Sequence, residues 1–310
     1  MVDNTMLMDL MDAYLTECEI RKLAPKTIEG YKKLLRAMLL WLSDNEQVER
    51  LSDLTPMHYK RYLLHKEKDG ASPQYINDIL RVMRTFSRFL YDEGYTPKLL
   101  TEKIKNVKQP KVKIVSFTEE EIQGMLNYYK GNSFLEVRNR AMIAMFFDTG
   151  IRCDELISMQ PEQVQSGFII INGKGSKQRV VPLSPILAKA LLKYDQTKKR
   201  YFRKKLPATN LFLSKNGRRL SNEAIRLVLI EAAKAVGVRN TVRVSPHTCR
   251  HTFAHTQLRN GCDVYTLSRL LGHESISITQ RYLDGIQDEQ VLRAGLLFSP
   301  LMNIKSKYGS

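Results

Sequence analysis

The sequence predicts a mainly α-helical protein with two domains, the second of which also contains a small β-hairpin. A length of 310 residues suits two domains, each large enough to bury a core of its own. Most apolar residues recur at helical spacing, and one stretch, residues 167–184, changes to the pattern of paired strands. The hydrophobic content of 43% and the charged content of 26% are typical of a globular chain.

Residues 1–105 are predicted to form an all-helical domain. Pro25 suits the first turn of a helix whose apolar residues return every three to four positions. Thr55-Pro56 and Ser72-Pro73 each place a capping residue before a proline at the first helical position, which marks two further helix starts. The helix that starts at Pro73 runs to about Asp92, and its apolar face comprises Ile76, Ile79, Leu80, Met83, Phe86 and Leu90.

Three arginines of that helix, Arg81, Arg84 and Arg88, share a different face because they are three and seven positions apart. Two interpretations stay open. The face is an ordinary solvated one, or it is a stripe that contacts DNA, which its purely positive charge favours.

Residues 106–115 are predicted to be a linker, since they are basic, contain Pro110 and lack a helical period. The second domain then covers residues 116–310. It opens with a capping box, in which Thr118 caps a helix and Glu121 reaches back to it.

Residues 167–184 are predicted to form the hairpin. Two β-branched runs flank the glycine-rich turn Gly-Lys-Gly-Ser-Lys at 173–177, which places Lys174 and Lys177 at the tip. Lys177 and Arg179 are candidate DNA contacts. The rest of the domain is expected to be mostly helical, with caps at Ser184 and Ser221 and a short amphipathic helix at about 287–298.

The charge is strongly asymmetric. The net charge is +17, of which residues 1–105 carry +1 and residues 106–310 carry +16. This asymmetry indicates that the second domain faces a polyanion, although a soluble basic protein is the simpler alternative. The basic run 198–205, with two aromatic residues in it, fits either a phosphate contact or a solvated loop.

Two features favour a cytoplasmic protein. The four cysteines form no C-x-x-C pair and are expected to be reduced thiols. The apolar runs are too short to cross a bilayer, and no signal peptide is evident.

Half of the six histidines gather in His-Thr-Cys-Arg-His-Thr-Phe-Ala-His-Thr at 247–256. A zinc protease motif would need a glutamate after His251, where Thr252 stands, so no metal site is predicted. His247 and Arg250 instead share a helix face next to an N-terminus opened by Ser245-Pro246, which suits a phosphate. His251 and His255 are expected on other faces.

Other residues fit the same phosphate site. Arg152 follows a glycine at a predicted helix start, and Glu155 is placed to orient a neighbouring arginine or histidine. Lys174 can reach into a cleft from the hairpin tip. His273 lies in Leu-Gly-His, and Tyr282 follows in Gln-Arg-Tyr-Leu. Each of these residues has an ordinary surface or packing explanation when taken alone.

As a set, these stretches resemble the tyrosine recombinase (phage integrase) family. The matching motifs are T-G-I-R-C-D-E-L, G-K-G-S-K-Q-R-V-V-P-L, H-T-C-R-H-T-F-A, L-G-H and Q-R-Y, spread over residues 149–282. The resemblance implies a SAM-like core-binding domain for the helical first part and an α+β catalytic domain for the second. It implies a catalytic set of Arg152, Lys174, His247, Arg250, His273 and Tyr282.

The resemblance also implies a chemistry that needs no metal and no cofactor. Tyr282 would attack a DNA phosphodiester to form a 3′-phosphotyrosyl link, with Glu155 behind the catalytic residues. The resemblance favours Lys174 over Lys177 as the hairpin lysine. Tyr265 and Tyr308 do not follow Leu-Gly-His at the family spacing, so Tyr282 is the expected nucleophile.

The implied partners are double-stranded DNA with specific recombination sites and further copies of this chain. A tetramer would form by exchange of residues 287–298, and an accessory directionality protein would join it. The implied role is recombination for a mobile element, with chromosome dimer resolution of the Xer type as the alternative. A relaxing enzyme like the type IB topoisomerases and a DNA-binding protein without catalysis are the remaining rivals.

Overall fold

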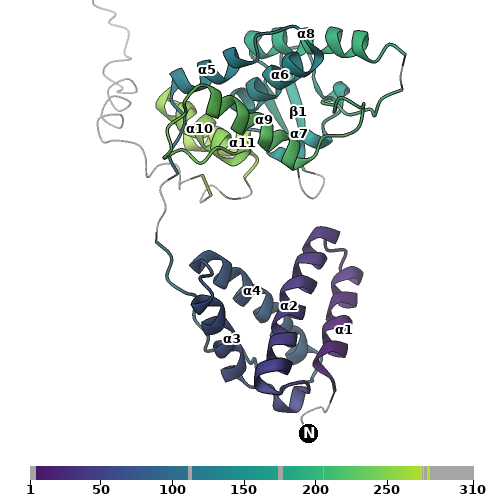
Figure 1. Ribbon diagram of the computed structural model, residues 1–310, viewed down its shortest axis with the longest axis vertical. Coiled ribbons are helices and arrows are strands. Elements are labelled where there is room, and N and C mark those ends of the chain that lie inside the picture. Colours follow the sequence, from purple (N-terminus) through teal and green to yellow (C-terminus); the bar gives the residue numbers. More distant parts are fainter. Residues whose placement is uncertain are drawn as a thin grey trace, which may run out of the picture. The chain divides into compact units, whose positions relative to one another are not determined.

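The computed structural model describes residues 5–110, 114–173, 177–204, 206–273, 275, 278 and 279. The chain divides into two compact units, Met1–Val112 and Lys113–Ser310 (Figure 1). The described ranges are mostly helical and contain one two-stranded sheet, which confirms the predicted fold class. None of the helices described is long and apolar enough to cross a membrane.

The first unit packs four helices around one core. In chain order these are α1 (Leu7–Ile20), α2 (Pro25–Glu46), α3 (Pro56–Lys68) and α4 (Pro73–Asp92), with a 3₁₀ turn, η1 (Leu51–Asp53), before α3. As predicted, a proline opens each of α2, α3 and α4, where the missing N–H costs no hydrogen bond. The core includes the aromatic side chains of Tyr14, Tyr59 and Phe86.

The chain that follows α4 is tied back to that helix by side-chain hydrogen bonds. The backbone N–H of Leu100 donates to the buried hydroxyl of Ser87 at 2.9 Å. Arg84 donates to the carbonyl oxygen of Ile104 and to the amide oxygen of Asn106, both at 2.7 Å. Arg84 therefore has a structural role on the face for which the sequence leaves a DNA contact open.

The second unit is built around α6 (Phe134–Thr149), which is buried over most of its circumference. Figure 1 shows α8 (Pro185–Tyr201) along one side of α6, with α5 (Glu119–Tyr128) and α10 (Pro246–Arg259) also packed against it. The remaining elements are α7 (Cys153–Ser158), η2 (Pro161–Gln163), α9 (Asn222–Ala235) and α11 (Val264–Leu271).

The predicted hairpin is present as β1 (Phe168–Asn172) and β2 (Gln178–Pro182), paired antiparallel. Ile170 lies opposite Val180, and Ile171 lies opposite Arg179. Residues on the inner face, including Ile169, Ile171 and Val181, are buried in the core of the unit. This alternation fixes the register, because a slip of one residue would turn the inner side chains outward.

Local capping defines where the helices of this unit begin. The backbone N–H of Thr118 donates to the Glu121 carboxylate at 2.8 Å, and the N–H of Glu121 donates to the Thr118 hydroxyl at 3.2 Å, so the predicted capping box is confirmed. The predicted caps at Ser184 and Ser221 are confirmed by hydrogen bonds at 3.1 Å each.

Gly150 ends α6 in the left-handed conformation, with φ of 60°. A Cβ atom at this position would lie 2.5 Å from the ring of Phe253 on α10, so the glycine also allows α6 and α10 to approach each other. This close approach places the carbonyl of Gly150 beside Arg250 of α10.

We expect Gly150→Ala to destabilise the chain more than Gly237→Ala. Both glycines have positive φ, 60° and 70°, but nothing lies within 4 Å of a Cβ at Gly237. The left-handed strain of about 1–2 kcal/mol is common to both variants, and only Gly150→Ala adds the clash with Phe253. Urea unfolding should show the difference, and equal losses for the two variants would contradict the proposed close approach.

Candidate active site

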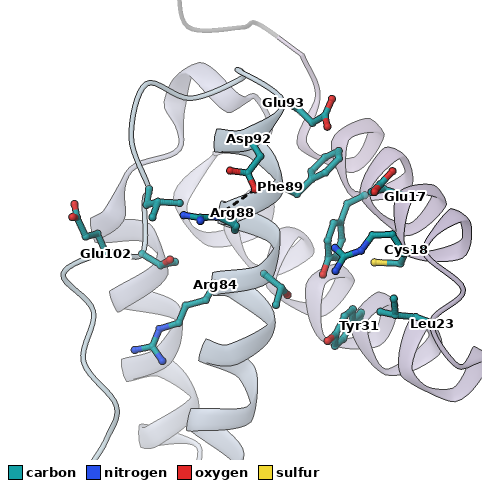
Figure 2. Close-up of a pocket in the computed structure, with 15 residues that line it drawn as sticks. Glu17, Cys18, Leu23, Tyr31, Arg84, Arg88, Phe89, Asp92, Glu93 and Glu102 are labelled. Carbon is teal, nitrogen blue, oxygen red and sulfur yellow. Dashed lines mark ion pairs between the residues drawn. The ribbon is translucent and has the colours of Figure 1, made fainter. Parts of the chain in front are cut away.

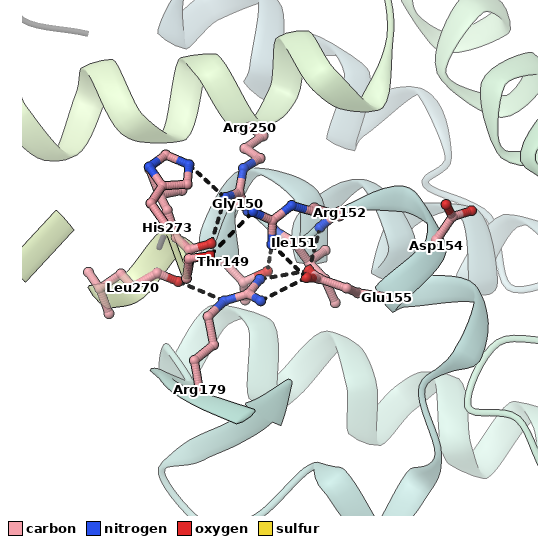
Figure 3. A network of polar contacts seen from close by, with 12 residues as sticks. Thr149, Gly150, Ile151, Arg152, Asp154, Glu155, Arg179, Arg250, Leu270 and His273 are labelled. Atoms are coloured by element: carbon pink, nitrogen blue, oxygen red, sulfur yellow. Dashed lines mark hydrogen bonds and ion pairs between the residues drawn. The ribbon is translucent and has the colours of Figure 1, made fainter. Parts of the chain in front are cut away.

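The candidate site forms where the end of α6, the start of α7, strand β2, α10 and the end of α11 meet (Figure 3). Its central group is the carboxylate of Glu155, whose side chain is 7% exposed. Arg179 donates to both carboxylate oxygens, at 2.8 and 2.7 Å. Arg152 donates to the same carboxylate through its guanidinium at 2.8 Å and through its backbone N–H at 2.9 Å.

Glu155 is ionised despite its burial. Burial would raise its pKa, but the hydrogen bonds and charge of Arg179, together with the hydrogen bonds from Arg152, lower the pKa to about 2. The carboxylate thus holds two guanidinium groups in fixed positions. This is the orienting role that the sequence predicts for Glu155, with the addition of Arg179.

Arg250 approaches from α10 and is 4% exposed. Its guanidinium donates to the carbonyl oxygen of Gly150 at 2.7 Å and to that of Leu271 at 2.6 Å. The Nη2 atom also lies 3.1 Å from Nε2 of His273. Two helix ends and an imidazole therefore fix this arginine in the interior of the site.

The end of α11 completes the cluster. Gly272 has φ of 64° and ends this helix, and its carbonyl lies 3.4 Å from Nη2 of Arg152. Arg179 donates through Nε to the carbonyl of Leu270 at 2.9 Å. His273 follows Gly272, and its Nδ1 atom lies 2.8 Å from the hydroxyl oxygen of Thr279. The structure thus brings Arg152, Arg250 and His273 together, as the sequence predicts.

His247 lies in the first turn of α10, whose N-terminus is capped by Ser245 through a 3.1 Å hydrogen bond from Thr248. Desolvation and the positive charges of Arg250 and Arg243 lower the pKa of His247. The ring is therefore predominantly neutral at neutral pH, as a proton acceptor must be.

The expectation that His251 lies on another face is wrong. Its Nε2 atom lies 3.1 Å from Nε2 of His247, and the two rings meet edge to face with centroids 4.6 Å apart. The cause is helical geometry, since residues four apart are neighbours on a helix surface.

Among the residues that the structure describes, no group of three histidine, cysteine, aspartate or glutamate side chains could hold a metal ion.

Arg179 has a different place from the one predicted. The sequence predicts a DNA contact on the hairpin, but the Arg179 side chain is 8% exposed and its guanidinium donates to the Glu155 carboxylate and to the carbonyl of Leu270. The sequence holds a signal for this position. Arg179 is two residues before the buried Val181, so strand alternation places it on the inner face of the hairpin.

Two predicted catalytic residues, Lys174 and Tyr282, lie outside the residues that the structure describes, as do the rival Tyr308 and the predicted helix at 287–298. Lys177 is described and follows the undescribed tip of the hairpin. The other rival nucleophile, Tyr265, lies at the start of α11 and is 62% exposed.

The arginine stripe on α4 is not purely positive, contrary to the expectation that favoured a DNA contact. Arg81 pairs with Asp78 at 3.2 Å, and Arg88 pairs with Asp92 at 3.3 Å. Figure 2 shows Arg84 and Arg88 at a neighbouring cleft of about 580 Å³. Four carboxylates also line this cleft, namely those of Glu17, Asp92, Glu93 and Glu102. Its mixed charge does not favour a polyanion.

A more strongly basic surface contains part of the basic run 198–205, to which the structure adds cations from a second segment of the chain. The turn of residues 214–217 and the two residues after it pack beside the end of α8, where the hydroxyl of Tyr201 donates to the carbonyl of Lys215 at 3.4 Å. We call this surface the α8-end patch. Its exposed cations are Arg200, Arg203, Lys204, Lys215, Arg218 and Arg219.

Below the α8-end patch, the chain is held rigidly. Arg138, which is buried, donates to the carbonyl of Leu213 at 3.0 Å, and Lys198 donates to that of Leu211 at 3.2 Å. The N–H of Leu213 donates to the hydroxyl of Tyr194 at 3.2 Å. Cations on a rigid support can present a fixed pattern to a ligand.

Comparison with known families agrees with this geometry. The family model described as "Phage integrase family" matches residues 116–288, and the model described as "Phage integrase, N-terminal SAM-like domain" matches residues 11–94. The chain belongs to the phage integrase family. It is a site-specific recombinase of the tyrosine type, and the family resemblance inferred from its motifs is confirmed.

Relatives of this recombinase match along most of their length. Tyrosine recombinase XerD of Oceanobacillus iheyensis is 30% identical over 265 residues, which cover 84% of this chain and 88% of the relative. The protein of the same name from Halalkalibacterium halodurans is 29% identical over 264 residues, with the same coverage of each chain.

Solved structures share the fold of this recombinase. A lambda integrase dimer bound to a COC′ core site superposes with a TM-score of 0.71 at 18% identity, over 92% of this chain and 79% of that one. XerH site-specific recombinase bound to palindromic difH substrate in a post-cleavage complex superposes with a TM-score of 0.73 at 19% identity, over 89% and 81%.

We expect Glu155→Gln to remove an acid-sensitive part of the stability of this recombinase. The folded-state pKa of about 2 lies below the ordinary value of 4.5, so the stabilisation is present above pH 4.5 and is lost as the pH falls toward 2. Its size is about 3 kcal/mol. Urea unfolding between pH 6 and pH 2 should show a shallower decline for Glu155→Gln than for the wild type, and parallel declines would contradict the assignment.

Proposed function

We propose that this recombinase cleaves and rejoins double-stranded DNA at specific sites through a 3′-phosphotyrosyl link to Tyr282. In this proposal, the reaction integrates or excises a mobile element. The observation that carries the proposal is the convergence of Arg152, Arg250 and His273 beside a helix N-terminus that bears His247. Arginine forks and imidazole N–H groups match the oxygens of a phosphodiester.

In the proposed reaction, the phenolic oxygen of Tyr282 attacks the phosphorus atom, and the bond from phosphorus to the 5′-oxygen breaks. His247 accepts the phenolic proton, and Lys174 supplies a proton to the leaving 5′-oxygen. Arg152 and Arg250 stabilise the charge that grows on the non-bridging oxygens. A 5′-hydroxyl of another strand then attacks the phosphotyrosine and restores a phosphodiester, so no external energy source is needed.

The arginines suit this role differently. Glu155 fixes Arg152 at one end of its guanidinium, and the Arg152 side chain is 43% exposed, so it can meet a phosphate from solution. Arg250 is buried and held by carbonyl oxygens, which orient the guanidinium without neutralising it. One arginine can thus receive the phosphate at the surface while the other provides a fixed positive charge behind it.

Assembly on DNA is part of the proposal. Solved relatives include a lambda integrase tetramer bound to a Holliday junction, with a TM-score of 0.72. For this recombinase we propose a tetramer joined through residues 287–298, an accessory directionality protein, and action in the bacterial cytoplasm at the nucleoid. The first unit would bind the core DNA site together with the catalytic unit.

Chromosome dimer resolution is the second candidate role, since the similar curated relatives carry the name XerD. The chemistry at Tyr282 is the same in both roles. The DNA sites differ, and sequencing of DNA that is covalently trapped on the protein in its host distinguishes them. Sites at the ends of a mobile element support the main role, whereas one chromosomal site supports the second.

We expect Tyr282→Phe to abolish the covalent protein–DNA adduct on a nicked suicide substrate while it leaves DNA affinity within about twofold. The substitution removes only the attacking oxygen. The adduct is measured by denaturing gel electrophoresis and the affinity by a mobility shift. An adduct that persists in Tyr282→Phe would assign the nucleophile to another residue, and Tyr265→Phe is the matched control.

The α8-end patch is proposed as a contact for DNA phosphates. Its cations are exposed. The backbone N–H of Ser184, at the N-terminal end of α8, donates to the carboxylate of Asp148 at 3.4 Å, two residues before Gly150. A helix of 17 residues spans about 25 Å, so the patch can reach phosphates several base pairs from the scissile one.

We expect the double variant Arg218→Gln/Arg219→Gln to weaken DNA binding for all sequences alike. The slope of log affinity against log salt concentration should become shallower by the amount expected for the loss of about two phosphate contacts. The matched control is Lys189→Gln/Lys193→Gln, which removes two charges from the exposed side of the same α8. Affinity is measured by fluorescence anisotropy between 50 and 200 mM salt. Equal salt slopes for the two double variants would exclude the patch as a specific contact.

A further inference from the structure

His247 and His251 form a hydrogen-bonded pair on α10. Their Nε2 atoms lie 3.1 Å apart, and their rings meet at 76° with centroids 4.6 Å apart. A contact between two ring nitrogens at this distance needs one N–H group and one lone pair. The pair therefore constrains where the proton of His247 resides, which matters because His247 is the proposed proton acceptor.

His251 is suited to be the lone-pair partner. Burial, with smaller contributions from His247, His255 and Arg250, lowers its pKa to about 4, so its ring is neutral at neutral pH. A neutral ring with a lone pair on Nε2 can accept a hydrogen bond from a protonated neighbour. It does not compete with that neighbour for the proton.

Positive charges near the pair disfavour protonation of His247, and an acceptor on Nε2 counteracts their effect. Among the described residues, the charged or titratable groups that act on the two rings are Arg243, Arg250 and His255. Both arginines disfavour a positive charge on His247. An acceptor on Nε2 offsets part of this repulsion when His247 takes up a proton.

We propose that His251 is a positioning residue for His247, whose protonated ring it holds by accepting a hydrogen bond from Nε2. The proposal rests on the proposed function, in which His247 accepts the proton of Tyr282. That proton enters on Nδ1, while the proton on Nε2 stays with His247 and is shared with His251. A base that is oriented by a third group is a general arrangement in nucleophilic catalysis.

The test is the pH dependence of covalent adduct formation on nicked suicide DNA. His247 works only when it is deprotonated, so the rate falls as the pH drops through its pKa. We expect His251→Phe, which removes the acceptor, to lower that pKa. The acid limb of the pH–rate profile, where the rate falls with falling pH, should then move to lower pH by about one unit. The rate at neutral pH should fall roughly tenfold because the ring is no longer oriented.

Two further variants separate positioning from packing. His251→Gln keeps an amide oxygen near the position of Nε2 and should restore the acid limb to within about 0.3 pH unit. His255→Phe is the matched control, because this histidine lies one turn beyond His251, with ring centroids 6.3 Å apart, and about 12 Å along the axis from His247. It should leave the limb in place.

A double-mutant cycle completes the experiment. In a His247→Gln background, His251→Phe should cause no further loss of rate, since its effect acts through His247. Additive losses, or an unmoved acid limb in His251→Phe while the wild type forms the adduct, would overturn the positioning role alone. Absence of any adduct with the wild-type chain would overturn the proposed function itself.

Discussion

The candidate active site depends on one buried carboxylate, that of Glu155. A buried negative charge is costly unless it is paired and hydrogen-bonded, and here four hydrogen bonds from Arg152 and Arg179 satisfy it. Arg179 belongs to β2 and also binds the end of α11. One carboxylate therefore joins α7, the hairpin and α11, and it sets the position of Arg152, which is proposed to contact the phosphate.

A second constraint is the use of helix ends. Gly150 and Gly272 both end their helices in the left-handed conformation, and the carbonyl groups at these ends face the arginines of the site. Carbonyl oxygens at a helix C-terminus have no partner within the helix, so they are ready acceptors for guanidinium groups. The two glycines thus join the backbone of the fold to the geometry of the site.

Much of the fold could be predicted from the sequence because its determinants are local. Prolines at first helical positions, serine caps and the change of period at the hairpin all act within a few residues. The same holds for Arg152 with Glu155, which are three positions apart. The contact of His251 with His247 can also be predicted from the sequence, because residues four apart are neighbours on a helix surface.

The rest of the site could not be predicted in this way. The contact of Arg179 with Glu155 joins residues 24 positions apart, and that of Arg250 with Gly150 joins residues 100 positions apart. Such contacts depend on how helices and strands pack. The family motifs place Arg152 and Arg250 in one site, but they do not specify the groups that hold each arginine. The pairing of Arg81 with Asp78 and of Arg88 with Asp92 is local, because the partners are three and four positions apart, and the spacing of the arginines alone does not reveal it.

The surroundings of Arg250 affect how much solvent must reorganise around its guanidinium when an anion binds. The guanidinium has already exchanged most of its water for two carbonyl dipoles and a contact with the imidazole of His273. An anion that arrives beside it has no hydration shell to strip from this group, and the field of the full charge acts through a medium of low polarisability. The cost of desolvating the cation is met when the chain folds, long before any strand is cut.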